Sequence, residues 1–253
     1  MKKPIFAILI FIMLVTKTYA GWYECFSYKG NIDKYPISLS LQIKEGYFGE
    51  KSKENFNLIG VYKYDKHNNP IRLEGLLDFK KNKVLLYEIN NGKYTATFEF
   101  EFSKDKCVGV WTNLSTNQRL PLQLTNTSIL IDQIEENEFN NIEILQTDSL
   151  AEFYFIGVYS KKMNQDKAQM DRLKIIHKKD NVVFQIIDFS KIETSTGNII
   201  TIIFDNVEVA DNKDKEFIVW NDIGRMGGYL TLKFDIKTNK FKLDPKPIID
   251  GAN

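Results

Sequence analysis

Hydrophobic and polar residues alternate in short runs along most of this chain. Residues Ile37–Ile43 alternate strictly, and between Tyr94 and Phe102 one face carries alanine and phenylalanine while the other carries threonine and glutamate. This period of two is typical of β-strands that bury one face and expose the other. Similar runs predict further strands at 62–64, 71–73, 84–88, 108–111, 153–159, 173–177, 182–187, 199–204, 217–220, 229–234 and 241–243.

Polar turns separate these strands, and their spacing predicts the fold class. Asn90-Asn91-Gly92 and the segment Lys237–Lys240 are turn sequences of the kind that join antiparallel neighbours. The sequence therefore predicts an all-β protein, with an N-terminal antiparallel barrel-like meander followed by a second antiparallel β domain that is blade-like or sandwich-like. We expect the first domain over residues 21–127 and the second over 128–253, with a short helix between 132 and 142.

The first twenty residues have the order of a secretory signal peptide. Lys2 and Lys3 precede an apolar run, and the small side chains of Thr18 and Ala20 follow it, which predicts cleavage between Ala20 and Gly21. The apolar run is shorter than the ~20 residues that a membrane-spanning helix needs. We therefore expect a periplasmic or secreted protein, without stable membrane insertion after cleavage.

Composition and charge narrow the classes of partner. Three of the 34 basic residues lie in the predicted signal peptide, which leaves 31 basic against 33 acidic residues in the remaining chain. Nucleic acids and anionic membranes attract basic surfaces, so this balance argues against both as partners. The 43% of hydrophobic and 26% of charged residues are typical of a globular chain.

The chain has two cysteines, Cys25 and Cys107. In an oxidising compartment such a pair usually forms one disulfide, which would close a loop of about 80 residues and stabilise the fold by roughly 4–5 kcal/mol. The alternative is a reactive thiol, but neither cysteine has a nearby histidine or a Cys-x-x-Cys spacing. We therefore expect a structural disulfide between Cys25 and Cys107.

Local motifs of enzymes are missing from this sequence. The two histidines, His67 and His177, have no partner at a spacing that suggests nucleophilic or zinc chemistry, so we interpret them as surface residues. The chain has no Gly-x-Ser-x-Gly, phosphate loop or dinucleotide fingerprint. A pair of catalytic carboxylates far apart in sequence stays open. We expect a protein that is not an enzyme and that needs no cofactor.

The segment Asp205–Glu216 is rich in acidic and amide side chains, which suggests calcium as one interpretation. Calcium-binding loops, however, need a glycine at their sharp turn, and this segment has none. Lys213 and Lys215 also bring positive charge into it. We prefer a solvated, charged hairpin between Phe204 and Phe217 and expect no metal site.

A glycine-rich connection from Trp220 to Tyr229 is the candidate partner-binding segment. It contains three glycines together with aromatic, arginine and methionine side chains, which are enriched in the cores of protein interfaces. The partner-binding candidates are Trp220, Asp222, Arg225 and Tyr229. The alternative is a long loop whose tryptophan and tyrosine cover the sheet beneath it.

Two resemblances extend these interpretations, and the first covers about a hundred residues. Short motifs follow one another as Tyr28-Lys29-Gly30, Tyr35-Pro36-Ile37, Gly60-Val61-Tyr62-Lys63-Tyr64, Ile71-Arg72-Leu73-Glu74-Gly75, Leu86-Tyr87-Glu88 and Gly109-Val110-Trp111. In this order, the segment from Tyr28 to Leu124 resembles a β-rich domain common in exported bacterial proteins. The resemblance supports the first domain and implies no activity.

The second resemblance lies between Val183 and Leu243. Its motifs are Gln185-Ile186-Ile187, the Asp205–Glu216 segment, Phe217-Ile218-Val219, Gly227-Gly228-Tyr229, Phe234-Asp235 and Lys240-Phe241. Their order resembles the C-terminal part of periplasmic β-propeller-like proteins that inhibit lysozyme-type enzymes and act as immunity partners of peptidoglycan-cleaving toxins. The chain departs from the pattern at Asn212-Lys213, where an Asp-Gly is expected, and this departure argues against calcium.

Together, export, the resemblance and the missing catalytic motifs predict a periplasmic protein that binds and inhibits a cell-wall hydrolase or toxin. A loop at Trp220–Tyr229 would then plug the cleft of the hydrolase, with Arg225 as donor to its catalytic carboxylates. The alternative is a barrel module of the cell envelope that holds an apolar ligand or a glycan. An envelope hydrolase of unrecognised type is a third and weaker hypothesis.

Overall fold

The computed structural model describes residues 23–44, 56–132, 136–163, 165, 167–192, 195–197, 200–223, 226–244, 246 and 248–249. The predicted signal peptide and Arg225 lie outside these ranges. The fold is all-β, as predicted, and its strands form one closed barrel and two further antiparallel sheets. In the described residues, no helix is long and apolar enough to cross a membrane.

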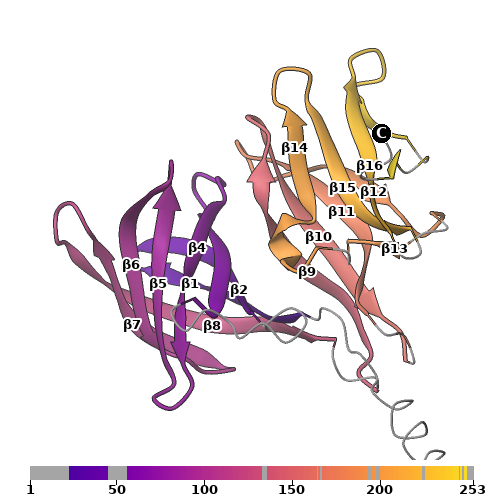
Figure 1. Cartoon of the computed structure of the whole chain (residues 1–253). Coiled ribbons are helices and arrows are strands. Elements are labelled where there is room, and N and C mark those ends of the chain that lie inside the picture. Colours follow the sequence, from indigo (N-terminus) through magenta and orange to yellow (C-terminus); the bar gives the residue numbers. More distant parts are fainter. Residues whose placement is uncertain are drawn as a thin grey trace, which may run out of the picture.

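The N-terminal part is an antiparallel barrel in which each strand pairs with the next, and the last strand pairs with the first (Figure 1). Its strands are β1 (Glu24–Ile32), β2 (Tyr35–Ile43), β3 (Leu58–Tyr64), β4 (Ile71–Asp78), β5 (Lys83–Asn90), β6 (Lys93–Glu101), β7 (Lys106–Asn113) and β8 (Arg119–Ile131). Short turns join most of these strands, which is the meander that the turn sequences predict.

Large side chains fill the barrel. Phe26, Tyr28, Tyr62 and Phe98 point inward and have at most 1% of their surface exposed. The rings of Tyr62 and Phe98 lie edge to face with centroids 5.0 Å apart. An eight-stranded barrel is just wide enough for its own side chains, and here aromatic rings occupy that space. This packing counts against the alternative in which the barrel interior holds a ligand.

The remaining strands form two sheets that pack face to face, in the sandwich-like arrangement that the sequence predicts (Figure 1). Rings of Phe155 and Phe217 meet across the two sheets with centroids 4.5 Å apart. The first sheet has the order β12 (Val183–Asp188), β11 (Gln169–His177), β10 (Phe153–Lys161) and β9 (Phe139–Ser149). The second contains β13 (Ser195–Thr196), β14 (Val207–Asp211), β15 (Glu216–Ile223), β16 (Met226–Asp235), β17 (Lys240–Leu243) and β18 (Ile248–Ile249).

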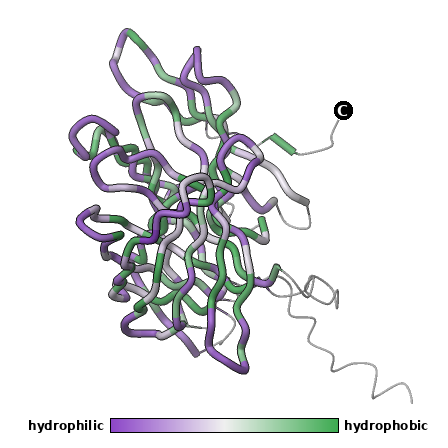
Figure 2. The backbone as a smooth tube through the Cα atoms, turned by 90° about the vertical axis from the view of Figure 1, so that its left-hand side faces the viewer, coloured by the Kyte–Doolittle hydropathy of each residue, from purple (hydrophilic) through white to green (hydrophobic). Residues whose placement is uncertain are grey.

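The barrel and the first of these sheets share one hydrophobic core. Cys25 and Val61, on the outer face of the barrel, belong to the same buried cluster as Ile144 and Tyr154 of β9 and β10. The predicted domain boundary after Thr127 falls inside β8, which continues to Ile131. Figure 2 shows that hydrophilic segments concentrate at the turns, while hydrophobic residues run along the strands.

Polar contacts also join the barrel to the segment that follows β13. The Gln42 amide donates to the Thr201 carbonyl over 2.8 Å and accepts from the Ile203 N–H over 2.9 Å. Arg72 pairs with Asp205 over 2.9 Å. These bonds explain why no strand forms over the described part, 200–204, of the strand predicted at 199–204. Its backbone bonds to a barrel side chain, and a short 3₁₀ turn, η2 (Ile203–Asp205), follows.

The predicted disulfide is wrong, because Cys25 and Cys107 are free thiols that lie far apart. Cys25 lies opposite Leu130 of β8, and Cys107 lies opposite Leu124 of the same strand. Six residues of strand span about 20 Å, whereas a disulfide needs Cα atoms within about 7 Å. The side chains also face opposite sides of the barrel wall, since Cys25 packs against the sheets and Cys107 packs inside.

We expect chemical labelling to find two free thiols per chain. Burial raises the pKa of the Cys25 thiol, so the native protein should react slowly with maleimide at neutral pH. Protein unfolded in guanidinium without reductant should add two maleimide groups by mass spectrometry. A chain that takes up no label until a reductant is added would contradict this arrangement.

The predicted helix between 132 and 142 is also wrong in its described part. Residues 136–138 form a turn and an irregular link, and β9 begins at Phe139. The apolar residues of that stretch have irregular helical spacing, whereas from Phe139 onward the chain pairs with β10. Strand pairing therefore decides the structure of a segment whose local pattern is weak.

Candidate functional site

The predicted partner-binding segment is a tight β-hairpin and not the long loop that its glycines suggest. Strands β15 and β16 pair in continuous register, with Trp220 opposite Tyr229 and Asp222 opposite Gly227. Phe217 and Val219 point into the core and are fully buried, so Ile218 between them points outward. The alternation of the strand therefore extends through the segment and fixes the outer positions of Trp220 and Asp222.

Trp220 and Tyr229 form an aromatic pair on the outer side of the second sheet. Their ring centroids are 6.0 Å apart with the planes at 78°, and both side chains are partly exposed. Ile248 lies opposite Tyr229 on β18 and is 49% exposed, and Ile218 lies two residues before Trp220 on the same face. We call Ile218, Trp220, Tyr229 and Ile248 the outer aromatic face.

Asp222 adds a carboxylate to this face. One carboxylate oxygen lies 3.8 Å from the ammonium of Lys167. The other oxygen is buried and has no hydrogen-bond partner within the part of the chain that the structure describes. A buried acceptor without a donor is costly, and only the oxygen beside Lys167 can meet a docked partner. The structure thus brings together three of the four predicted residues, and Arg225 lies outside the described ranges.

The acidic segment Asp205–Glu216 forms the charged hairpin that the sequence predicts, with β14 paired to β15. Its acidic side chains bond to different partners. Asp205 pairs with Arg72, Asp211 accepts the N–H of Lys213 over 2.7 Å, and Glu216 pairs with Lys233 over 3.1 Å. Among the described residues, no group of three histidine, cysteine or acidic side chains is arranged to hold a metal ion.

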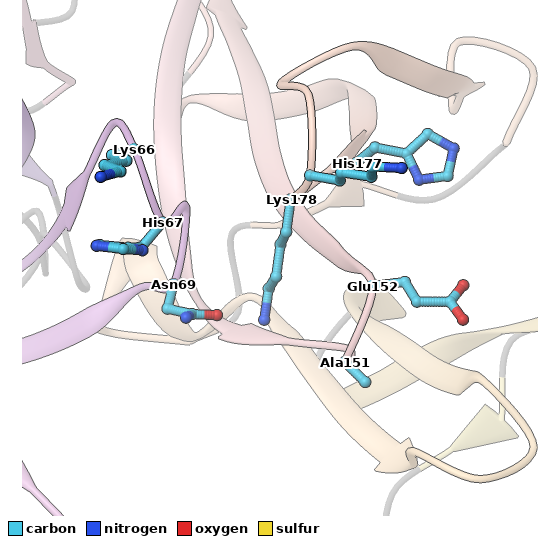
Figure 3. A pocket seen from close by; sticks show the side chains of 8 residues that line it. Lys66, His67, Asn69, Ala151, Glu152, His177 and Lys178 are labelled. Carbon is cyan, nitrogen blue, oxygen red and sulfur yellow. The ribbon is translucent and has the colours of Figure 1, made fainter.

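A second candidate site lies where the barrel meets the first sheet. Three turns surround a pocket of about 550 Å³ there: the β3–β4 turn, the β9–β10 turn and the β11–β12 turn (Figure 3). The pocket brings together His67 and His177, which the sequence places 110 residues apart and which we expect at the surface. The sequence has no local signal for this site, because its lining residues come from three separate turns, each with at most three polar side chains.

Asn68 holds the three turns in place. It has a φ of 54° and is buried, and asparagine is one of the few residues that adopts this left-handed conformation readily. Its amide donates to the Lys178 carbonyl over 2.9 Å and accepts from the Lys63 ammonium over 2.6 Å. The Lys178 N–H in turn donates to the Glu152 carbonyl over 2.9 Å. The walls of the pocket are therefore fixed by hydrogen bonds from both halves of the fold.

Comparison of the chain with protein-family models, with curated proteins and with solved structures gave no match. The resemblances at 28–124 and 183–243 therefore stay predictions.

Proposed function

We propose that this chain is an exported, periplasmic or secreted protein that binds a cell-wall hydrolase and inhibits it through the outer aromatic face. The observation that carries the proposal is the exposed pair of Trp220 and Tyr229 beside the incompletely bonded carboxylate of Asp222. Tryptophan and tyrosine are the residue types most enriched among binding hot spots. The class of partner follows from the export signal and from the resemblance of residues 183–243.

A rigid hairpin suits an inhibitor. The rings stand on two paired strands whose opposite face is packed in the core, so little conformational entropy is lost when a partner binds them. The Asp222 oxygen beside Lys167 would accept a hydrogen bond from a donor of the hydrolase, and the aromatic pair would exclude water around that bond. The outer aromatic face would then cover the cleft through which the glycan strand must enter. Arg225 stays a predicted donor to the carboxylates of the hydrolase.

A glycan is the alternative partner for the same face, because aromatic rings and a carboxylate also suit sugars. The filled barrel leaves the outer aromatic face as the place for such a ligand, in preference to the barrel interior. Soluble peptidoglycan fragments offered to the isolated protein separate the two possibilities. Saturable binding of fragments with no captured protein would favour the glycan and contradict the inhibitor.

We expect the chain from residue 21 onward to capture a cell-wall hydrolase from an envelope extract. Trp220→Ala should weaken this binding at least about tenfold, because truncation of a central aromatic anchor costs about 2 kcal/mol. Phe79→Ala is the matched control, since Phe79 is 61% exposed on the barrel, away from the face. Mass spectrometry identifies the captured protein, and biolayer interferometry measures its affinity. Equal binding by the two variants would contradict the proposed role of the outer aromatic face in binding.

A further inference from the structure

The pocket between the β3–β4, β9–β10 and β11–β12 turns is rich in positive charge. Lys66, His67, Lys178 and Lys179 line it, and Glu152 is the one carboxylate among the described lining residues. The pocket lies on elements other than those of the outer aromatic face. A positive pocket on a chain whose overall charge is close to neutral is a local feature that calls for an anionic partner.

Lys178 is the central cation of this pocket. Its side chain is half-buried, and its ammonium donates to the Ser149 hydroxyl over 3.0 Å. An ammonium has three donors, so two remain after this bond. Burial lowers the pKa of the Lys178 ammonium, because the side chain loses part of its hydration. In the described residues, no carboxylate forms an ion pair with Lys178.

Two carboxylates on turns beside the pocket are engaged elsewhere. Glu152 pairs with Lys215 over 2.7 Å, and Figure 3 shows its side chain pointing away from Lys178. Asp65 pairs with Lys63 over 2.9 Å and accepts from the Ser38 hydroxyl over 3.0 Å. The fold thus places a partly desolvated cation at the pocket and directs the neighbouring anions to other partners.

We propose that this pocket binds the phosphoryl group of a small ligand, with Lys178 and the amide of Asn69 as its direct contacts. Figure 3 shows the Lys178 side chain directed toward Asn69. A phosphoryl group offers three acceptor oxygens and about two negative charges, which match the two remaining donors of Lys178 and the field of Lys66 and Lys179. A carboxylate offers one charge and two oxygens, and so it matches this pocket less well.

Titration of the ¹⁵N-labelled chain with inorganic phosphate tests the proposal. We expect saturable shifts of the amides of residues 66–69, 151–152 and 177–179. Lys178→Gln should weaken binding at least about tenfold, because it removes a charge-assisted hydrogen bond. Lys106→Gln is the control, because this exposed lysine begins β7 at the other end of the barrel.

Two results would overturn the site. One is a set of shifts that sodium chloride of equal ionic strength reproduces, and the other is equal weakening by Lys106→Gln and Lys178→Gln. If Lys178→Gln does not fold, the exposed substitutions Lys66→Gln and Lys179→Gln decide the question. Together they should weaken binding about fivefold through the loss of two nearby charges. An unchanged affinity of that double variant would contradict the proposal.

The ligand class is tested by two further arms of the same titration. Acetate should bind at least about tenfold more weakly than phosphate because it carries half the charge. Equal binding of the two ions would contradict the phosphoryl assignment. Glycerol 1-phosphate distinguishes the source: tighter binding than inorganic phosphate indicates an organic phosphate monoester, and equal binding indicates the free ion.

Discussion

Gly75→Ala is expected to destabilise the protein by about 3 kcal/mol or more. An added Cβ at this position would lie 2.0 Å from the backbone carbonyl oxygen of Leu85 on the neighbouring strand. That oxygen belongs to the barrel wall and cannot move without disrupting the pairing of β4 and β5. A glycine inside a strand often marks such a close approach of two backbones.

Gly92→Ala is the matched control for this prediction. Gly92 has a φ of +72°, but no atom lies within 4 Å of an added Cβ. Its substitution should cost about 1 kcal/mol from backbone strain alone. Urea unfolding followed by circular dichroism measures both variants. Equal losses of stability at the two positions would contradict the close approach at Gly75.

Asp132 is expected to make the protein less stable as the pH rises from about 4 to about 6.5. Burial raises the pKa of its carboxyl from the ordinary 3.8 to about 6, although it accepts the N–H groups of Tyr23 and Ala168 over 2.8 and 3.0 Å. The native state therefore holds a proton that the unfolded chain has already released. Because the unfolded state binds fewer protons in this range, stability falls with rising pH. A shift of two pKa units corresponds to about 3 kcal/mol.

The pH dependence of Asp132→Asn isolates this effect. Asparagine keeps one acceptor but carries no titrating proton, so its own cost should be independent of pH. The wild type should exceed the variant in stability most at pH 4, and the difference should narrow by about 3 kcal/mol by pH 7. Carboxylates far from position 132, such as Asp235, titrate alike in both proteins and cancel. A difference that stays constant across this range would show that Asp132 does not hold its proton in the fold.

The alternation of residues predicts most of the fold. Strands such as β2, β6 and β10 can be predicted from the sequence. One face of each is buried in the core, and the other is exposed to solvent or packs against a different layer. The closure of the barrel by β1 and β8 is a long-range pairing, and no local pattern encodes it. Gly75 illustrates the link between the two levels, since it belongs to a motif of the first resemblance and lies where an added Cβ would meet the backbone of the neighbouring strand.

The wrong predictions have one physical cause in common, which is a contact between distant parts of the chain. The disulfide follows from the compartment and the cysteine count, but the barrel wall separates the two side chains. The strand expected at 199–204 has a suitable pattern, yet Gln42 takes the hydrogen bonds of its backbone. Sequence periodicity describes which face of a segment is apolar and does not name the partner that satisfies its polar groups.

In the candidate sites, too, the sequence indicates residue types but not which residues the fold brings together. Trp220 and Tyr229 are identifiable as residue types typical of interfaces, and strand pairing places them on one face with Asp222. The segment is a hairpin and not a long loop, because two strands in register leave only residues 224 and 225 between them. The pocket between the β3–β4, β9–β10 and β11–β12 turns was not predictable, since these turns meet only when the barrel packs on the sheet.

The most direct test of the central claim is the inhibition of the captured hydrolase by the purified chain. Turnover of peptidoglycan by that enzyme should fall in a saturable, one-to-one manner as wild-type protein is added. The Trp220→Ala variant should need at least about ten times more protein for half inhibition, and Phe79→Ala should match the wild type. An unchanged rate of peptidoglycan cleavage in the presence of excess wild-type protein would contradict the account.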